Sequence, residues 1–385
     1  MKRLFGAKSG RRKSARWSAV VAVVAALALA GCGSSSAGDN SGGSGSGNVD
    51  EDALDELLSQ EVELPYPTSP TDLGGDRNIT YIANGLAAGG NAEVAEARAE
   101  IYRKSGWTIE GPLDGQFTPS VQATLVEQAV LKGADGIIVD SIFPSQAPAA
   151  FKSARDAGIP IVCTHCQPEE SGNDVYMIQP SAESLTEPQI ALVLAAVGKD
   201  DATIVVVGAE FDSSKAVAES QLRLLEEQCP GCEIADITFP TSDLGQPTSP
   251  AFTNLLREYP PGQLDAVITP FAPATTVLLN LAEQAGRDDF KVVNTFGDAP
   301  ISTQIRDGER APLLFGDSII SQLFIGYAVI DTLARVFNGE EVPDYSNLPA
   351  APIAQQNAAD YVNDDGLWVP EDMESKFFEL WGLNN

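Results

Sequence analysis

The sequence predicts an α/β fold of two doubly wound lobes, each built on a parallel sheet. Between about residues 78 and 339, short runs rich in β-branched residues alternate with longer stretches of helical apolar spacing. This alternation is typical of a parallel sheet covered by helices on both faces. The alternating region spans roughly 260 residues, which is more than one sheet usually organises, so we expect two lobes.

The candidate strands are short apolar runs, and the candidate helices lie between them. Strands are expected at 79–83, 136–140, 160–163, 203–208, 233–239, 266–269, 291–296 and 312–316. Helices are expected at 92–105, 120–132, 147–157, 183–197 and 214–228. The second of these helices repeats apolar residues at Val121, Leu125 and Ala129, and Gly133 is suited to end it.

The predicted boundary between the lobes lies at 169–182. A turn-rich stretch there precedes a short connecting strand at 175–178. We expect lobe 1 to comprise residues 75–168 together with about 317–340. Lobe 2 is expected to comprise residues 175–316.

Residues 341–385 are predicted to form a C-terminal extension. This segment begins with Pro and Asn residues and ends in a run that contains Phe377, Phe378 and Trp381. Such a run suits a terminal helix with an apolar face, so we expect the extension to pack on the lobes.

The first 31 residues have the features of an export signal. Seven basic residues and no acidic residue lie within the first 16 positions, and an apolar run follows at 18–30. The run is shorter than the roughly 20 apolar residues that a membrane-spanning helix needs. It leads into Leu29-Ala30-Gly31-Cys32, which resembles the lipobox of bacterial lipoproteins, whose cysteine becomes the lipidated first residue. We expect a signal peptide at 1–31 and a lipid on Cys32; the alternative is a soluble secreted protein.

A flexible tether is expected at 32–60. Residues 33–48 are almost entirely Gly, Ser, Ala, Asp and Asn, a composition that cannot bury a core. The folded part would therefore stand off the membrane.

The chain is strongly acidic. It carries 24 basic and 54 acidic residues, and loss of the signal would leave 17 basic residues and a formal charge of −37. Such a surface excludes nucleic acid as a partner. It also repels anionic lipid, so the lipid on Cys32, rather than a basic patch, would hold the chain on the membrane.

Three units follow one another in the first predicted lobe. Residues 79–83 lead into a Gly-rich loop and a long helix; residues 128–140 read QAVLKGADGIIVD; residues 154–162 read ARDAGIPIV. In this order they resemble the type 1 periplasmic binding-protein family, and its sugar-binding branch in particular. The family's transcriptional repressors carry an amino-terminal helix-turn-helix, where this chain has an export signal. The resemblance implies two lobes joined by crossover hinge strands, with a ligand bound between them.

The residues that follow the predicted strands are the candidate ligand contacts. Ligands of open parallel sheets bind outside the carboxyl ends of the strands, where loops and helix amino termini project polar groups. The expected cleft residues are Asn84, Gly85, Asp140, Ser141, Phe143, Thr164, His165, Glu210, Phe211, Asp212, Phe271, Asp298, Asp317 and Ser318.

Asp140 and Asp298 are the candidates to bind hydroxyl groups. The resemblance places both where sugar binders of the family carry a carboxylate, and a carboxylate accepts strong hydrogen bonds from two neighbouring hydroxyls. The alternative for each is a helix cap at a strand-to-helix turn. Phe143, Phe211 and Phe271 are candidates to stack on a sugar's apolar face.

The sequence also departs from the sugar-binding branch. Binders of that branch often have an arginine after the second lobe's first strand and an asparagine after its third, and neither stands at 208–212 or 269–272. The expected cleft has five carboxylates and no lysine or arginine. An anionic ligand is therefore disfavoured, whereas a neutral polyol or a cation fits. We expect no cofactor.

Two CxxC pairs remain, Cys163-Thr164-His165-Cys166 and Cys229-Pro230-Gly231-Cys232. In an oxidising compartment we expect two local disulfides, Cys163–Cys166 and Cys229–Cys232. The pairs fall in different predicted lobes, which disfavours one shared metal site, and free or redox thiols are the other alternative. His165, the single histidine, would point into the cleft, either as a structural residue or as a donor to the ligand.

The sequence therefore favours a lipid-anchored, extracytoplasmic, monomeric solute-binding protein rather than an enzyme. It would capture a small neutral polar solute, a sugar or polyol, and deliver it to the membrane permease of an ABC importer. One alternative is a sensor lipoprotein of the same fold that presents its liganded state to a receptor. Another is a secreted thiol oxidoreductase, which would need an exposed reactive thiol at Cys163 or Cys166.

Overall fold

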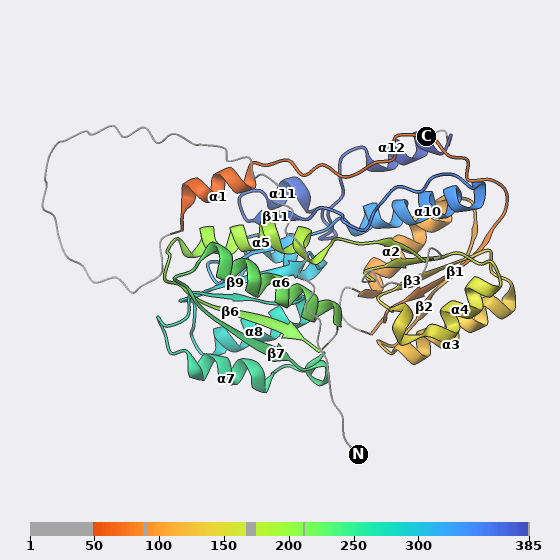
Figure 1. Cartoon of the computed structure of the whole chain (residues 1–385). Coiled ribbons are helices and arrows are strands. Elements are labelled where there is room, and N and C mark those ends of the chain that lie inside the picture. Colours follow the sequence, from red (N-terminus) through yellow and green to blue (C-terminus); the bar gives the residue numbers. More distant parts are fainter. Residues whose placement is uncertain (1–48, 88–90, 167–174, 211, 384–385) are drawn as a thin grey trace, which may run out of the picture. The chain divides into compact units, whose positions relative to one another are not determined.

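The computed structural model describes residues 49–87, 91–166, 175–210 and 212–383 (Figure 1). The predicted signal peptide and Cys32 lie outside the described residues. Two separate sheets form, one of five strands and one of six, and helices cover both. The predicted fold class of two α/β lobes with parallel sheets is confirmed.

Lobe 1 is built on a parallel sheet with the strand order β2-β1-β3-β4-β5. Its strands are β1 (Asn78–Ala83), β2 (Thr108–Asp114), β3 (Gly136–Asp140), β4 (Ile161–Thr164) and β5 (Val175–Ile178). One face is covered by α2 (Asn91–Lys104) and α10 (Gln322–Asn338), and the other by α3 (Pro119–Lys132) and α4 (Pro148–Asp156) (Figure 1). Because both faces are covered, β3 and β4 are buried along their whole length.

Lobe 2 is built on a sheet with the order β11-β10-β9-β8-β6-β7, in which only β11 is antiparallel. Its strands are β6 (Thr203–Ala209), β7 (Glu233–Phe239), β8 (Ala266–Ile268), β9 (Lys291–Phe296), β10 (Leu314–Ile319) and β11 (Ala351–Ala354). One face carries α5 (Ala182–Val197) and α6 (Asp212–Gln228). The other carries α7 (Pro250–Glu258), α8 (Ala272–Gln284), α9 (Ala299–Arg306) and α11 (Ala358–Tyr361).

Three short connections link the lobes. Residues 179–181 lead from β5 to α5, residues 320–321 lead from β10 to α10, and residues 339–350 lead from α10 to β11. The first and third run side by side, because Gln179 N donates to Tyr345 O at 3.0 Å and Leu348 N donates to Gln179 O at 2.9 Å. These connections are the crossovers that the resemblance implied.

The structure corrects the predicted lobe boundaries at two strands. β5, expected to begin lobe 2, pairs with β4 and is an edge strand of the lobe 1 sheet. β10, expected to end at residue 316, continues to Ile319 within the lobe 2 sheet, so lobe 1 resumes only at α10. Residues 317–319 were misassigned because a polar Asp-Ser pair resembles the end of a strand, whereas both side chains are buried here.

The predicted tether is also too long, because helix α1 (Glu51–Leu58) lies within it. Asp50 caps this helix by accepting a hydrogen bond from Ala53 N at 3.1 Å. Leu54 is buried against α5 of lobe 2. Leu57 and Leu58 pack against the same cluster, so an apolar face and a capped amino terminus hold this short helix on lobe 2.

Two strands, β2 and β11, were not predicted. Both contain a proline, Pro112 and Pro352, and both lie at an edge of their sheet. A proline is tolerated at a sheet edge because its missing N–H can face away from the ladder. The proline made each run look like a loop in the sequence.

The C-terminal segment ends in helix α12 (Met373–Leu380), which packs on α10 of lobe 1. Phe377 stacks on Tyr327 at 5.2 Å between ring centroids, and Trp381 stacks on the same ring at 5.9 Å. Among the described residues, no helix has both the length and the apolar character needed to cross a bilayer.

Candidate functional site

A cleft of about 400 Å³ lies where the carboxyl ends of strands from both sheets meet. Side chains of lobe 1 line one wall, including Asn84, Arg98, Phe117, Asp140, Ser141, Phe143 and His165. The lobe 2 wall includes Leu185, Glu210, Val217, Phe271, Phe296 and Asp298. Gln179, Pro180 and Gln322 contribute from the ends of the crossovers. This volume lies in the range of sites that bind small molecules.

Most of the residues that were predicted from strand ends line this cleft. They are Asn84, Gly85, Asp140, Ser141, Phe143, His165, Glu210, Phe271 and Asp298. Phe211 lies outside the described residues, as does the side chain of Asp212. Thr164 lies behind the wall, where its hydroxyl donates to Asp140 Oδ1.

Asp317 and Ser318 do not line the cleft, because both lie inside β10 rather than after it. Asp317 is fully buried and accepts a hydrogen bond from Asn294 Nδ2 at 2.8 Å. Burial, aided by the nearby Asp298 carboxylate, raises the pKa of Asp317 to about 8. Asp317 is therefore mainly uncharged at neutral pH. The expectation that it lines the cleft was wrong because the strand ends three residues later than predicted, at Ile319 instead of residue 316.

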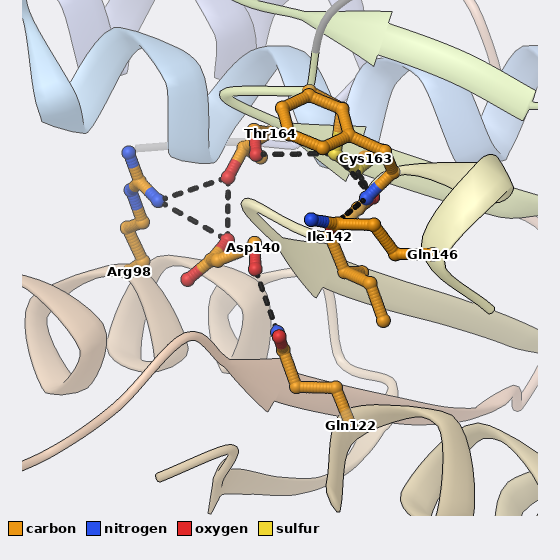
Figure 2. The surroundings of a disulfide bond; sticks show 9 residues. Arg98, Gln122, Asp140, Ile142, Gln146, Cys163 and Thr164 are labelled. Carbon is orange, nitrogen blue, oxygen red and sulfur yellow. Dashed lines mark hydrogen bonds and ion pairs between the residues drawn. A yellow bond between two sulfur atoms is a disulfide. The ribbon is translucent and has the colours of Figure 1, made fainter. Parts of the chain in front are cut away.

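Asp140 is the centre of a buried polar cluster in lobe 1 (Figure 2). Tyr81 Oη donates to Asp140 Oδ2 at 2.8 Å, and Thr164 Oγ1 donates to Oδ1. Arg98 Nη1 lies 3.4 Å from the same Oδ1. Gln122 Nε2 donates to the backbone oxygen of Asp140 at 2.7 Å, which fixes the end of β3. Oδ1 thus has two donors, whereas Oδ2 has one and keeps capacity for a second, so the cluster holds Asp140 in place without saturating it.

Arg98 is the main residue that the sequence reasoning missed. We expected no lysine or arginine in the cleft, yet Arg98 reaches it from α2 with a side chain that is only 2% exposed. Burial opposes its charge, but Asp140, Tyr81 and Tyr102 together exceed that effect and raise the pKa of Arg98. A signal was present, because Arg98 shares the spacing of the buried Ala95, Ala99 and Tyr102 on one face of the helix.

The carboxylates of lobe 2 are held differently. Asp298 Oδ2 accepts from Ala272 N at 2.8 Å, so it caps the first turn of α8 rather than its own helix. Burial raises the pKa of Asp298. Glu210 lies exposed at the rim, where Oε2 accepts from Thr241 N at 2.9 Å and from Thr241 Oγ1 at 2.6 Å, and these bonds lower its pKa. The alternative of a capping role for Asp298 thus holds, although its side chain also faces the cleft.

Four phenylalanines line the cleft, two on each wall. Phe143 and Phe271 were expected, whereas Phe117 and Phe296 were not. Phe117 follows the unpredicted strand β2. Phe296 is the last residue of β9, and only Asp298, two residues further on, was expected to reach the cleft from this strand. A side chain at Gly85 would collide with the Phe117 ring, so the glycine is what allows this ring into the wall. The cleft therefore offers aromatic faces as well as polar groups.

Unusual backbone conformations gather in this wall. Seven described residues other than glycine have a positive φ, and four of them line the cleft: Phe117, Ser141, His165 and Phe296. A positive φ is strained for such residues, and it persists where surrounding contacts impose it. Strain of this kind concentrates at functional sites, which supports the assignment of the cleft.

The cysteine pairs lie apart, as predicted. The sulfur atoms of Cys163 and Cys166 lie at disulfide distance, with Cα atoms 5.8 Å apart, and those of Cys229 and Cys232 do so with Cα atoms 5.4 Å apart. Cys163 and Cys166 are fully buried, which opposes a thiol oxidoreductase that needs an exposed thiol. No group of three or more metal-binding side chains gathers in the described part of the chain.

Comparisons with known proteins agree with this geometry. Residues 81–341 match the family described as a periplasmic binding protein domain. A sugar ABC transporter protein from Yersinia enterocolitica is 19% identical with a TM-score of 0.67, covering 84% of this chain and 99% of that one. An Agrobacterium vitis ABC transporter solute-binding protein, solved with allitol, is 16% identical with a TM-score of 0.64, covering 74% and 97%.

A third structure has the same fold. The 5-methylthioribose transporter solute-binding protein of Thermotoga lettingae, in complex with 5-methylthioribose, is 18% identical with a TM-score of 0.63. The match covers 80% of this chain and 94% of that one. At identities this low the likeness concerns the fold, and the bound ligands are properties of the neighbours.

Proposed function

Because the chain belongs to the family of periplasmic binding protein domains, we propose that it captures a small neutral sugar or polyol between its two lobes. The family is one of solute-binding domains, in agreement with the expectation that the chain is not an enzyme. The observation that carries the proposal is the cleft of about 400 Å³, whose two walls combine hydrogen-bonding groups with phenylalanine rings.

The charge of the cleft favours a neutral solute. Arg98 is the one cation that faces the cleft among the wall residues named above, and Asp140 compensates it. On the opposite wall, Asp298 forms no ion pair with another described residue, and Glu210 interacts with the charge of Lys215 at the exposed rim. Among the cleft-lining residues the three carboxylates Asp140, Glu210 and Asp298 outnumber the one arginine, so an anionic ligand is disfavoured, whereas hydroxyl groups can donate to the carboxylates.

The predicted contacts that line the cleft are proposed as ligand contacts. Asp140 and Asp298 would accept hydrogen bonds from hydroxyls on opposite walls, and Phe143 and Phe271 would cover apolar faces of the solute. The backbone strain at Ser141 and His165 supports their inclusion. Asp317 is withdrawn from the list, since it lies beneath the cleft.

Delivery of the solute to the permease of an ABC importer is proposed on the basis of the family and of the export signal in the sequence. A lipid on Cys32 would hold a monomeric chain on the extracytoplasmic face of the membrane. Mass spectrometry of the mature chain tests the anchor: a diacylglyceryl group on Cys32 supports it. A mature amino terminus at any other residue contradicts it.

A thermal-unfolding panel tests the ligand class. The chain is heated with D-ribose, D-allose, allitol and glycerol, and with sugar phosphates and cationic amines as contrasting classes. A ligand at a hundred times its dissociation constant stabilises the native state by about 2.7 kcal/mol. We expect a shift with a neutral sugar or polyol and none with the phosphates. A shift with sugar phosphates alone would contradict the proposal.

Asp140→Asn is the variant that connects a positive result to the cleft. Asparagine keeps the size of the side chain but loses half of its acceptor capacity, so the ligand-induced shift should shrink or vanish. Asp135→Asn is the matched control, because Asp135 lies at the opposite end of β3 and accepts from Asn78 N at 2.7 Å. An equal loss of binding in both variants would argue against the cleft assignment.

A further inference from the structure

We infer that Arg98 holds His165 in its neutral Nδ1–H tautomer, so that His165 presents a fixed hydrogen-bond donor that selects solutes with an acceptor oxygen at this point of the cleft. The inference rests on the proposed function for its ligand, but the state of the histidine can be measured without one. It also assigns a role to the Cys-Thr-His-Cys motif, which the solute-binding proposal leaves unexplained.

The contact between Arg98 and His165 determines which ring nitrogen carries the proton. Arg98 Nη2 lies 3.1 Å from His165 Nε2. A guanidinium group only donates hydrogen bonds, so Nε2 must offer its lone pair to this contact. The single proton of a neutral ring then resides on Nδ1.

The competing arrangement places the proton on Nε2 and directs it to Gln322 Oε1, 3.3 Å away. That oxygen already accepts a hydrogen bond from Arg98 Nη2. A proton on Nε2 would also stand against the N–H and the positive charge of Arg98 at 3.1 Å. The lone pair on Nε2 removes this repulsion, and both Arg98 and Gln322 keep their hydrogen bond.

The charged form of the ring is excluded on the same ground. Burial and the positive charge of Arg98 lower the pKa of His165 to about 3. Imidazolium would add a second positive charge beside a guanidinium that is itself only 2% exposed. His165 is therefore neutral throughout the range in which an extracytoplasmic protein works.

Arg98 cannot turn away from the ring, because its other nitrogens are occupied. Nη1 donates to Thr164 Oγ1 at 3.3 Å and lies 3.4 Å from Asp140 Oδ1. Nε donates to Gln322 O at 3.3 Å. Because these contacts fix the guanidinium group of Arg98, Arg98 sets the orientation of the His165 ring rather than adjusting to it.

The backbone of His165 is fixed as well. Its φ is +56°, and its N–H donates to Ile178 O at 3.3 Å. Cys163 and Cys166 flank it in the chain, and both sulfur atoms lie against Ile142 O, at 3.4 and 3.1 Å (Figure 2 labels Cys163 and Ile142). These contacts thus keep the histidine in a backbone conformation that few residues adopt.

The ring faces the cleft and is partly exposed there. Phe296 of the other wall meets it edge-on, with 6.3 Å between the ring centroids. Among the described residues, Nδ1 has no hydrogen-bond partner. The Nδ1–H group can donate a hydrogen bond but cannot accept one. It therefore favours a hydroxyl, ether or carbonyl oxygen of the solute and disfavours an ammonium group.

Nitrogen-15 NMR of the imidazole ring tests the tautomer in the full chain without ligand. The chain contains one histidine, so the two ring signals need no assignment among residues. We expect one protonated nitrogen, Nδ1, between pH 5.5 and 8. A protonated Nε2, or an imidazolium signal at neutral pH, would overturn the inference.

Ligand binding by histidine variants tests the selection. With D-ribose, D-allose and allitol as probes, His165→Leu should weaken binding by about five- to tenfold, the effect of one neutral hydrogen bond. His165→Asn offers an amide donor near the position of Nδ1 and should recover part of the loss. Binding of the probes by His165→Leu at wild-type strength would contradict the donor role.

The two cysteine pairs supply a matched comparison. Cys163→Ala with Cys166→Ala should weaken probe binding, whereas Cys229→Ala with Cys232→Ala should not, although both pairs close loops of the same length. Equal losses of probe binding in the two double variants would contradict the role of Cys163 and Cys166 in positioning His165. If none of the probes binds even to the wild type, the proposed function and the donor role fall together, while the NMR result decides the tautomer on its own.

Discussion

In lobe 1 a charged cluster of buried polar side chains reaches the cleft, whereas in lobe 2 a network of uncharged buried side chains lies beneath the cleft. The lobe 1 cluster joins Arg98, Asp140, Thr164 and His165. Three of these four residues line the cleft wall. Lobe 1 thus presents polar groups to the solute whose positions are already set.

The lobe 2 network lies among α5, α6, α8 and the ends of β8 to β10. Gln221 Nε2 donates to Gln189 Oε1 at 2.7 Å, and Gln189 Nε2 donates to Thr295 Oγ1 at 2.8 Å. Asn294 Nδ2 donates to Asp317, which is mainly protonated at neutral pH. All of these side chains are buried.

The difference indicates a division of roles. The polar groups of the lobe 2 network bond to one another and not to the cleft, so the wall of this lobe offers the solute its phenylalanines and two carboxylates. The lobe 1 groups keep acceptor and donor capacity that faces the cleft. A solute would therefore find its most rigid hydrogen bonds on lobe 1.

Removing the cation of lobe 1 should have the largest effect on stability. Arg98→Met leaves the Asp140 carboxylate buried without its charged partner, and we expect a loss of about 3–5 kcal/mol in the free energy of unfolding. Urea denaturation measures it. Adding Asp140→Asn to the same chain should restore part of the loss, because no unpaired charge remains. A loss below about 1 kcal/mol in Arg98→Met would mean that water, not Arg98, stabilises Asp140.

The stability contributed by the lobe 2 network should depend on pH through Asp317. The native state holds a proton on Asp317 up to its pKa of about 8, while the unfolded chain releases it near pH 4, so stability falls as pH rises between these values. Asp317→Asn cannot ionise. Its stability relative to wild type should rise by up to about 1.4 kcal/mol per pH unit across this window. If the free energies of unfolding of wild type and Asp317→Asn changed with pH in the same way, the pKa of Asp317 would not be raised, and the prediction would be wrong.

A single hydroxyl of the same network should matter less. Thr275 Oγ1 lies 2.6 Å from Thr269 Oγ1 and 2.5 Å from Asn294 Oδ1. Thr275→Val keeps the shape and leaves both partners short of a bond, so we expect a loss of about 1–3 kcal/mol by urea denaturation. Thr276→Val, one residue further along α8 and only partly buried, is the control and should change stability little.

The smallest effect is expected at the exposed rim of lobe 2. Glu210 lies in water, where it accepts hydrogen bonds from Thr241 and interacts with the charge of Lys215. Glu210→Gln keeps an acceptor for that bond, and we expect the melting temperature to stay within about 2 °C of wild type. A drop as large as that of Thr275→Val would show that the rim, like the network below it, stabilises the lobe.

Much of the fold was predictable because its signals are local. Apolar periodicity located β3, β7 and β9 at the bounds that the structure has, and glycines located helix ends. The errors occurred where a neighbour in space outweighs the local pattern. Edge strands accept a proline, and a buried strand such as β10 accepts Asp317 because Asn294 satisfies it.

The cleft was predictable only as far as strand ends mark it. Asp140, Ser141, Phe143 and His165 were found because they follow parallel strands, whose carboxyl ends share one edge of the sheet. Residues that enter from a helix or from an unpredicted strand, such as Arg98 and Phe117, could not be found by that rule.

The sequence by itself determined the fold class, the family resemblance and the acidic character of the chain, because each depends on composition or on spacing along a short stretch. Tertiary structure decided how Arg98 is used. Its partners Asp140, Thr164 and Gln322 lie 42, 66 and 224 positions away along the chain. Only the packing of α2 and α10 on one face of the lobe 1 sheet brings them together. Hydrogen bonds act over about 3 Å, so no pattern along the chain records them.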